Sequence, residues 1–410
     1  MNIIDVINKK RFGKELSYEE LDYAFTGYLK QQHEDYQISS LLMAIVINGM
    51  TLKETMDLTD IFIKSGEILD LSSINEPIID KHSTGGVGDS TTLVVGPIVA
   101  AAGCHMAKIS GRGLGITGGT IDKLESIPKF NVNLTKKAFI KGLKKVGFVD
   151  SAQTKNLVPL DKIIYNLRNN SGTTESIPLI ASSIMSKKIA SGADIILIDI
   201  KIGSGALIKT KKDAKILSNW MKEIGKKYNK KIVTIISDMN VPLSNSIGNA
   251  LEIEEAINVL KGNKTRLYET SKEIASILIS LSKKITINEA EEIVDKVIKD
   301  KSAYKKFLEF VSYQGGDIKK LKINAKIKVI RSDKNGILKT INAKKIGELS
   351  LKLGAGKIND NESIDHSAGI KLFKEIGNTI KKGDILATLY TNKNIKLSND
   401  DINCFEIEDI

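Results

Sequence analysis

The chain has little of several residue types that mark common classes of protein. Among 410 residues there are two cysteines, Cys104 and Cys404, which lie far apart in the sequence. This predicts no disulfide framework and fits a reducing compartment. No apolar segment of the secretory type follows the first residues, and the longest apolar stretches, 41–47 and 93–102, are too short to span a bilayer. We therefore expect a cytoplasmic protein without a membrane segment.

Arginine is also scarce, which bears on the net charge of +12. Of the 61 basic residues only five are arginines, and the lysines alternate with acids along helical segments such as 211–231. Arginine reads phosphates and base edges better than lysine, and no aromatic-rich platform for bases is present. The sequence therefore predicts no nucleic-acid partner. Two of the five arginines, Arg112 and Arg168, lie in segments rich in other ligand-binding residue types.

Three glycine-rich clusters are the most informative part of the chain. They are KHSTGGVGD (81–89), SGRGLG (110–115) and TGGT (117–120). Glycine lets backbone N–H groups approach a ligand, while hydroxyls and Lys81 add further donors. The apolar run 91–104 predicts a buried helix whose N-terminus would face the same ligand. One such cluster is as often a plain turn, but three together predict an anion site. The clusters match neither the GxxxxGK[ST] pattern of nucleoside-triphosphate loops nor the GxGxxG pattern of dinucleotide loops.

Local signals organise the rest of the sequence. Ser17 with Glu20, and Thr51 with Glu54, have the spacing of capping boxes that open helices. The apolar runs 193–200 and 232–237 have the length of buried strands, and the helical pattern 211–230 between them predicts a βαβ unit. Near the end, runs at 326–330 and 337–341 flank Asn335-Gly336, which predicts a hairpin.

These signals predict a small all-helical domain, a larger α/β domain with a mainly parallel central sheet, and a C-terminal β-rich α+β lobe. The helical domain comprises 1–66 and 157–190, the α/β domain 67–156 and 191–322, and the lobe 323–410. Because the chain leaves the helical domain and returns to it, we expect a cleft between the two domains.

Five segments carry a resemblance to a known family. They are KHSTGGVGD, SGRGLG-x-TGGT-x-DKLESIP, Leu167-Arg168, SIPLIASSIMSKKIA (176–190) and DIKIGSGA (199–206). In order and spacing they are similar to the pyrimidine-nucleoside phosphorylases of the thymidine phosphorylase family, and the similarity weakens after about residue 315. The resemblance implies reversible phosphorolysis of uridine, thymidine and deoxyuridine to the free base and α-D-(deoxy)ribose 1-phosphate. It also implies a homodimer formed through the helical domain.

The resemblance assigns two groups of substrate-binding residues. For phosphate, the co-substrate, they are Lys81, His82, Ser83, Thr92, Lys108, Ile109, Ser110 and Thr120. For the pyrimidine they are Arg168, Ser183 and Lys187, of which the last two are four apart and share one face of a helix. Arg168 and Lys187 would stabilise the departing base anion, and His82 would act as general acid, since an imidazole titrates near neutral pH.

A potassium ion, one per subunit, is implied by the same resemblance, and no organic cofactor is expected. Its ligands would be Gly88, Ser90, Leu243, Ser246 and Glu255. Lys108 resembles the branch of the family with broad substrate specificity. Two departures put domain closure and activity in doubt: the family usually has His where this chain has Ile116, and Asp where it has Asn169.

Three alternatives stay open. A strict thymidine phosphorylase would reject uridine. A phosphoribosyltransferase of the same architecture would need acidic residues that hold a metal and a diphosphate, for which Asp89 alone is a poor candidate. A nucleoside-binding protein with a decayed site would fit the changes at Ile116 and Asn169. Phosphate-dependent release of uracil and thymine separates these cases.

Overall fold

The computed structural model describes residues 1–113, 115–116, 118–357, 362–398, 401 and 403–409. Two members of the glycine clusters, Leu114 and Thr117, thus lie outside the described residues. The described chain forms two compact units. The first unit comprises residues 1–80, 153–196 and 210–234, and the second comprises 81–152, 197–209 and 235–410. Among the described residues, no helix has the length and apolar character needed to cross a bilayer.

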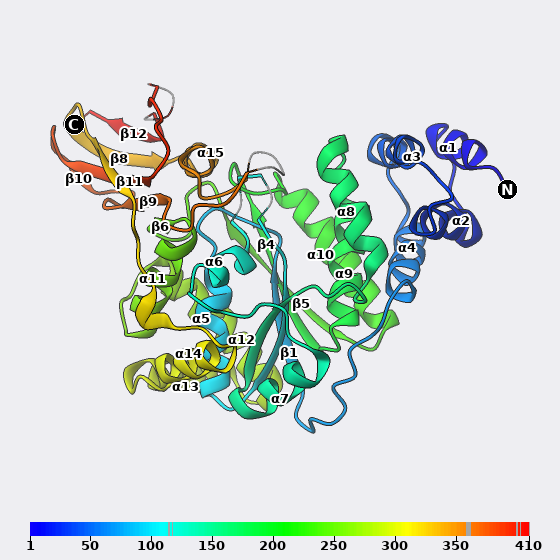
Figure 1. Cartoon of the computed structure of the whole chain (residues 1–410), viewed down its shortest axis with the longest axis horizontal. Coiled ribbons are helices and arrows are strands. Elements are labelled where there is room, and N and C mark those ends of the chain that lie inside the picture. Colours follow the sequence, from blue (N-terminus) through cyan, green and yellow to red (C-terminus); the bar gives the residue numbers. More distant parts are fainter. Residues whose placement is uncertain (114, 117, 358–361, 399–400, 402, 410) are drawn as a thin grey trace. The chain divides into compact units, whose positions relative to one another are not determined.

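The first unit is built mainly from helices. They are α1 (Ile3–Arg11), α2 (Tyr18–Leu29), α3 (Asp35–Asn48), α4 (Leu52–Lys64), α8 (Pro159–Ser171), α9 (Ile177–Ala190) and α10 (Lys211–Lys227). The capping boxes at Ser17 and Thr51 are both formed, because each hydroxyl accepts from the N3 amide and each N3 glutamate accepts from the cap amide. The helices α4 and α9 pack against each other, and α10 packs against α9 (Figure 1).

A five-stranded sheet has the order β3-β2-β1-β4-β5. Its strands are β1 (Ile78–Ser83), β2 (His105–Ser110), β3 (Phe148–Ala152), β4 (Ile195–Ile202) and β5 (Lys231–Asp238). The strands β2 and β3 pair in parallel, and helical crossovers join β1 to β2 through α5 (Thr91–Ala101) and β4 to β5 through α10. The predicted βαβ unit is therefore confirmed.

Helices of the second unit surround α5, which is apolar and buried almost throughout because it packs against other helices on several sides. The helices that pack against α5 are α11 (Asn249–Leu260), α12 (Arg266–Lys283), α13 (Ile287–Lys299) and α14 (Ser302–Tyr313). Of the other helices in this unit, α6 (Thr120–Glu125) packs against α11 and α7 (Lys136–Val146) packs against β3, and a short 3-10 turn follows α14 at Ile318–Lys320. The aromatic rings of Phe148 and Phe310 meet beside α5, with centroids 4.4 Å apart.

The C-terminal lobe is rich in antiparallel strands, as predicted (Figure 1, orange to red). Its elements are β7 (Lys326–Arg331), β8 (Gly336–Ile341), α15 (Ala343–Leu353), β9 (Gly369–Leu372), β10 (Thr379–Ile380), β11 (Ile385–Thr391) and β12 (Phe405–Glu408). One sheet has the order β10-β8-β12, and the other, β6-β9-β11-β7, includes β6 (Ser246–Ile247).

The predicted hairpin at Asn335-Gly336 is wrong. The strand β7 pairs with β11 and the strand β8 pairs with β10 and β12, so the two strands belong to different sheets. The Asn335 side chain accepts a hydrogen bond from the Lys382 amide at 2.9 Å instead of closing a two-residue turn. Pairing with strands more distant in sequence thus outweighs the local turn signal.

Candidate active site

The predicted site residues fall into two groups, one in each unit. The base-binding group, Arg168, Ser183 and Lys187, lies in the first unit. The phosphate-binding group lies in the second unit, as do the predicted potassium ligands. Each group is built by neighbouring elements whose side chains are held by hydrogen bonds and ion pairs.

Arg168 is almost fully buried near the end of α8, where its guanidinium is held by backbone carbonyls. Its Nε, NH1 and NH2 groups donate to the carbonyl oxygens of Thr173 at 3.1 Å, Leu179 at 3.1 Å and Thr174 at 2.8 Å. Burial lowers the pKa of Arg168 to about 10, although the nearby Asp161 carboxylate and the Tyr165 hydroxyl act in the opposite direction. The side chain remains a cation at neutral pH, and neutral dipoles fix its orientation.

Lys187 is the more accessible cation of this group. Its ammonium donates to the Ser183 hydroxyl at 2.7 Å, one turn earlier on α9, and it also pairs with Asp161 of α8. The Tyr165 ring lies close to both cations, 5.5 Å from Lys187 Nζ and 5.9 Å from the central carbon of the Arg168 guanidinium. The structure therefore brings the three predicted base-side residues together within the first unit.

Asp161 lies beside this group, although the sequence did not predict it there. Its side chain is buried, and its Oδ1 atom has no hydrogen-bond partner among the described residues. It lies 26 residues before Lys187, so no local spacing connects the two. A faint signal exists on α8 itself, since residues 161 and 168 are seven apart and share one face of a helix.

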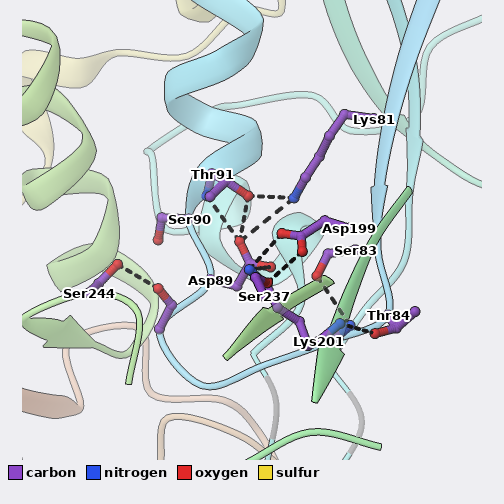
Figure 2. Close-up of polar contacts among 12 residues, drawn as sticks. Lys81, Ser83, Thr84, Asp89, Ser90, Thr91, Asp199, Lys201, Ser237 and Ser244 are labelled. Atoms are coloured by element: carbon purple, nitrogen blue, oxygen red, sulfur yellow. Dashed lines mark hydrogen bonds and ion pairs between the residues drawn. The ribbon is translucent and has the colours of Figure 1, made fainter. Parts of the chain in front are cut away.

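The first glycine cluster joins the end of β1 to the start of α5. Lys81 is buried, and its ammonium contacts the Thr91 hydroxyl and lies 3.7 Å from Asp89 Oδ1 (Figure 2). Asp89 in turn accepts from the amide and the hydroxyl of Thr91, the first residue of α5. Ser83 accepts from the Gly85 amide at 3.3 Å, and Thr92 is buried one residue into α5.

The other predicted phosphate residues lie in the same unit. Lys108 and Ile109 are buried in β2, and Lys108 Nζ lies 3.5 Å from the Ile109 carbonyl oxygen. The Ser110 hydroxyl donates to the buried Asp150 carboxylate at 2.9 Å. Thr120 is the first residue of α6, and His82, which is half-buried, belongs to β1.

The second and third clusters approach each other closely. A Cβ atom at Gly119 would lie 2.1 Å from the Gly113 nitrogen, so only glycine fits there. Arg112, which the sequence placed among ligand-binding residues, is occupied by ion pairs with Asp122 at 3.0 Å and Glu125 at 2.6 Å. It therefore braces this pair of loops.

The predicted potassium ligands come from the first cluster and the residue after it, from residues 243–246 and from α11, and hydrogen bonds join these segments. The Ser244 hydroxyl donates to the Gly88 carbonyl, and the Leu243 amide donates to the Val87 carbonyl at 3.1 Å. Glu255 accepts from the Asn245 and Ser246 amides. The Ser90 hydroxyl donates to Glu252, whose charge is balanced by Lys123 at 2.7 Å.

The two departures from the family pattern have different surroundings. Asn169 is exposed, and the carbonyls of Thr173, Thr174 and Leu179 already orient Arg168. Ile116 is half-buried, and a Cβ atom at Gly347 of α15 would lie 3.0 Å from the Ile116 Cβ. Ile116 therefore packs against α15 within its own unit.

Family comparisons cover most of the chain. Residues 4–66 match the glycosyl transferase family helical bundle domain, 75–304 match the glycosyl transferase family a/b domain, and 337–401 match the pyrimidine nucleoside phosphorylase C-terminal domain. Pyrimidine-nucleoside phosphorylases from Staphylococcus epidermidis and Geobacillus stearothermophilus are 47% and 45% identical over 401 residues. These alignments cover 96% of this chain and 92% and 93% of the two relatives.

The chain belongs to the pyrimidine-nucleoside phosphorylase family. The pyrimidine-nucleoside phosphorylase of Bacillus subtilis is a further relative, 45% identical over 96% of this chain and 93% of its own length. Anthranilate phosphoribosyltransferase from Thermus thermophilus is similar in fold alone, with a TM-score of 0.61, 14% identity, and coverage of 76% of this chain and all of that one. The predicted family and fold class are both confirmed, and the protein is an enzyme of the glycosyl transferase type.

Proposed function

We propose that this enzyme catalyses the reversible phosphorolysis of uridine, thymidine and deoxyuridine to the free base and α-D-(deoxy)ribose 1-phosphate. The observation that carries the proposal is 45–47% identity to pyrimidine-nucleoside phosphorylases over nearly the full length of both chains. The two groups of site residues supply the chemistry it needs: a buried ammonium and hydroxyls for phosphate, and two cations for the leaving base.

The reaction replaces a bond between a sugar carbon and a ring nitrogen by a bond to phosphate oxygen. As the base leaves, negative charge develops on it, and preorganised cations stabilise such a transition state most effectively. Arg168 and Lys187 serve this purpose, and His82 donates a proton to the O2 edge of the pyrimidine. The broad specificity rests on Lys108, which resembles the corresponding residue of that branch of the family and is buried in the same unit as the other proposed phosphate residues.

The direct test is incubation of the protein with each nucleoside, with and without inorganic phosphate, followed by chromatography of the free bases. We expect phosphate-dependent release of both uracil and thymine. Release of base from thymidine and deoxyuridine but not from uridine would identify a strict thymidine phosphorylase. Nucleoside binding without release in either condition would identify a decayed, binding-only protein.

Lys187 offers the cleaner test of the base-binding group, because Arg168 also ties together three backbone carbonyls. We expect Lys187→Met to lower kcat by about 10²–10³-fold, the usual effect of removing one preorganised donor. Lys162→Met removes an exposed lysine of the neighbouring helix and should leave kcat unchanged. Equal activity of both variants would contradict the role of Lys187.

His82 is tested through the pH dependence of the rate. We expect His82→Ala to lower kcat by about 10²–10⁴-fold, the range typical of a general acid, and to flatten the profile between about pH 6 and 8. Steady-state kinetics at a series of pH values would measure both effects. Nearly full activity with an unchanged profile would leave electrostatic stabilisation as the sole source of leaving-group assistance.

We also propose a potassium ion held by Gly88, Ser90, Leu243, Ser246 and Glu255. Their carbonyl, hydroxyl and carboxylate oxygens suit a hard cation. Glu255 is buried without a cationic partner among the described residues, and this burial raises the pKa of its carboxyl group. A bound cation would supply the missing charge and join the phosphate loop to the turn before α11.

Potassium binding should appear as thermal stabilisation. We expect KCl to raise the melting temperature more than choline chloride at equal ionic strength, since an ion that binds only the folded state stabilises it. Glu255→Gln should abolish the difference. Glu254→Gln, which removes an acid from a looser ion pair with Lys371, should preserve it. If the difference in melting temperature between KCl and choline chloride were the same in the wild type, Glu255→Gln and Glu254→Gln, this site would be refuted.

The helical domain is proposed to form a homodimer in the cytoplasm. Large apolar side chains are exposed on α1, α3 and the turn after α1, with Phe12 68% and Ile47 73% exposed, alongside Ile4, Tyr36 and Met43. Such a patch on two helices that pack together is typical of a protein interface.

An acidic residue within this patch should prevent dimer formation. We expect a dimer for the wild type by light scattering after gel filtration, and a monomer for Ile47→Asp, because a buried unpaired carboxylate is costly. The matched control is Ile287→Asp, which places the same charge at another exposed isoleucine, at the start of α13. A monomeric wild type would contradict the proposed dimer.

A further inference from the structure

A second buried lysine accompanies Lys81 in the second unit. Lys201 lies at the end of β4, within the DIKIGSGA segment, and has no exposed surface. Together with Lys81, Asp89 and Asp199 it forms a cluster of two cations and two anions, which we call the four-charge cluster (Figure 2). A cluster of this size needs matched charges, because an unpaired buried charge is strongly unfavourable.

Asp89 is shared between the two lysines. Its Oδ1 atom lies 3.7 Å from Lys81 Nζ, and its Oδ2 atom lies 4.0 Å from Lys201 Nζ. Oδ1 already accepts two hydrogen bonds from Thr91, whereas Oδ2 has no hydrogen-bond partner among the described residues. One lysine therefore approaches each oxygen, and Lys201 approaches the oxygen that is otherwise unsatisfied.

Lys201 also pairs with Asp199, 2.6 Å away on the same face of β4. The other oxygen of Asp199 accepts from the Ser237 hydroxyl. The strand end is fixed to the first glycine cluster by two further bonds: the Thr84 amide donates to the Asp199 carbonyl at 3.1 Å, and the Lys201 amide donates to the Thr84 hydroxyl at 2.9 Å. The position of Lys201 relative to Asp89 is thus set by the backbone.

Phosphate binding changes the charge balance of this cluster. With phosphate at Lys81, as the proposed function has it, the anion and Asp89 compete for a single ammonium. Two like charges at this separation in a dry site oppose each other unless a second cation stabilises one of them. Among the described residues, Lys201 is the only cation besides Lys81 that pairs with the Asp89 carboxylate, since Lys123 contacts Asp89 through its backbone carbonyl.

We propose that Lys201 is a positioning residue for phosphate, which holds the charge of Asp89 while Lys81 pairs with the anion. The inference rests on the proposed function, since phosphate must bind at Lys81. Lys201 itself needs no contact with the substrate. Its effect falls on phosphate, because the nucleoside base is bound by residues of the other unit.

The experiment measures binding of inorganic phosphate by calorimetry, without nucleoside, together with the KM values for phosphate and uridine. We expect Lys201→Gln to raise the phosphate Kd about thirtyfold or more, which is the lower end of the cost of truncating a buried charge pair. The uridine KM should change far less. Lys201→Arg should retain most of the affinity, and Lys209→Gln, at an exposed lysine eight residues further along the chain, should match the wild type.

Two double variants separate this role from simple pairing with Asp199. D89N/K201Q removes the charge that competes for Lys81 and should restore phosphate affinity to within a few fold of the wild type, while the introduced amide oxygen can still accept from Thr91. D199N/K201Q restores the charge balance of the cluster but leaves Asp89 in competition with phosphate for Lys81. Its phosphate affinity should therefore stay as low as that of Lys201→Gln. Melting temperatures show whether each variant is folded. If Lys201→Gln alone does not fold, the phosphate affinities of the two double variants still show whether Lys201 acts through Asp89 or through Asp199.

Phosphate affinity unchanged in Lys201→Gln, or restored equally well by D199N/K201Q, would overturn the inference and leave the proposed function intact. A wild-type protein that binds no phosphate, and releases no base in its presence, would overturn the proposed function and this inference with it.

Discussion

A charge that is withdrawn from water is costly unless an opposite charge lies nearby, and this requirement shapes much of the structure. Lys10, Lys81, Lys123, Lys188 and Lys201 are all buried, and each lies within ion-pair distance of an acid. The Lys188–Asp80 pair, with 2.8 Å between the charged atoms, joins α9 to β1 directly before Lys81. Buried ion pairs add little net stability but penalise any arrangement that separates them, so they specify how these loops and strand ends are placed.

The same requirement explains why the two cations of the base-binding group differ. Arg168 donates to three carbonyl oxygens, which are neutral, so these bonds fix its orientation without cancelling its charge. Lys187 shares its charge with Asp161, which keeps the ammonium in place in the absence of substrate. Under the proposed function, a departing base anion would meet Arg168, whose orientation is fixed, and Lys187, which would exchange its contact with Asp161 for one with the ligand. The phosphate side has a similar arrangement, with Lys81 beside Asp89.

Local sequence signals predicted the elements well where the signal and its partner lie within one helical turn. The capping boxes at Ser17 and Thr51 set the starts of α2 and α4, and the helical pattern over 211–230 corresponds to α10. The hairpin predicted at Asn335-Gly336 is wrong because the stability of a strand pair depends on which distant strands compete for it.

The places of Asp161 and Lys201 could not be predicted for a related reason, since Lys187 and Asp89, with which they pair, are distant in sequence. One signal was present: Asp199 and Lys201 are two apart in an apolar strand, which places two charges on one buried face.

The two departures from the family pattern show how a site tolerates change when several groups share a task. An acid at position 169 could orient Arg168, but carbonyls at 173, 174 and 179 provide that orientation, and Asp161 supplies a negative charge nearby. Position 169 is exposed, where water would weaken the field of a carboxylate in any case. At position 116 the apolar side chain of Ile116 packs against Gly347, so burial of apolar surface takes the place of a polar contact at this position. Both changes therefore lie at positions where the surrounding residues, and not the substituted side chain, determine the geometry of the charged groups.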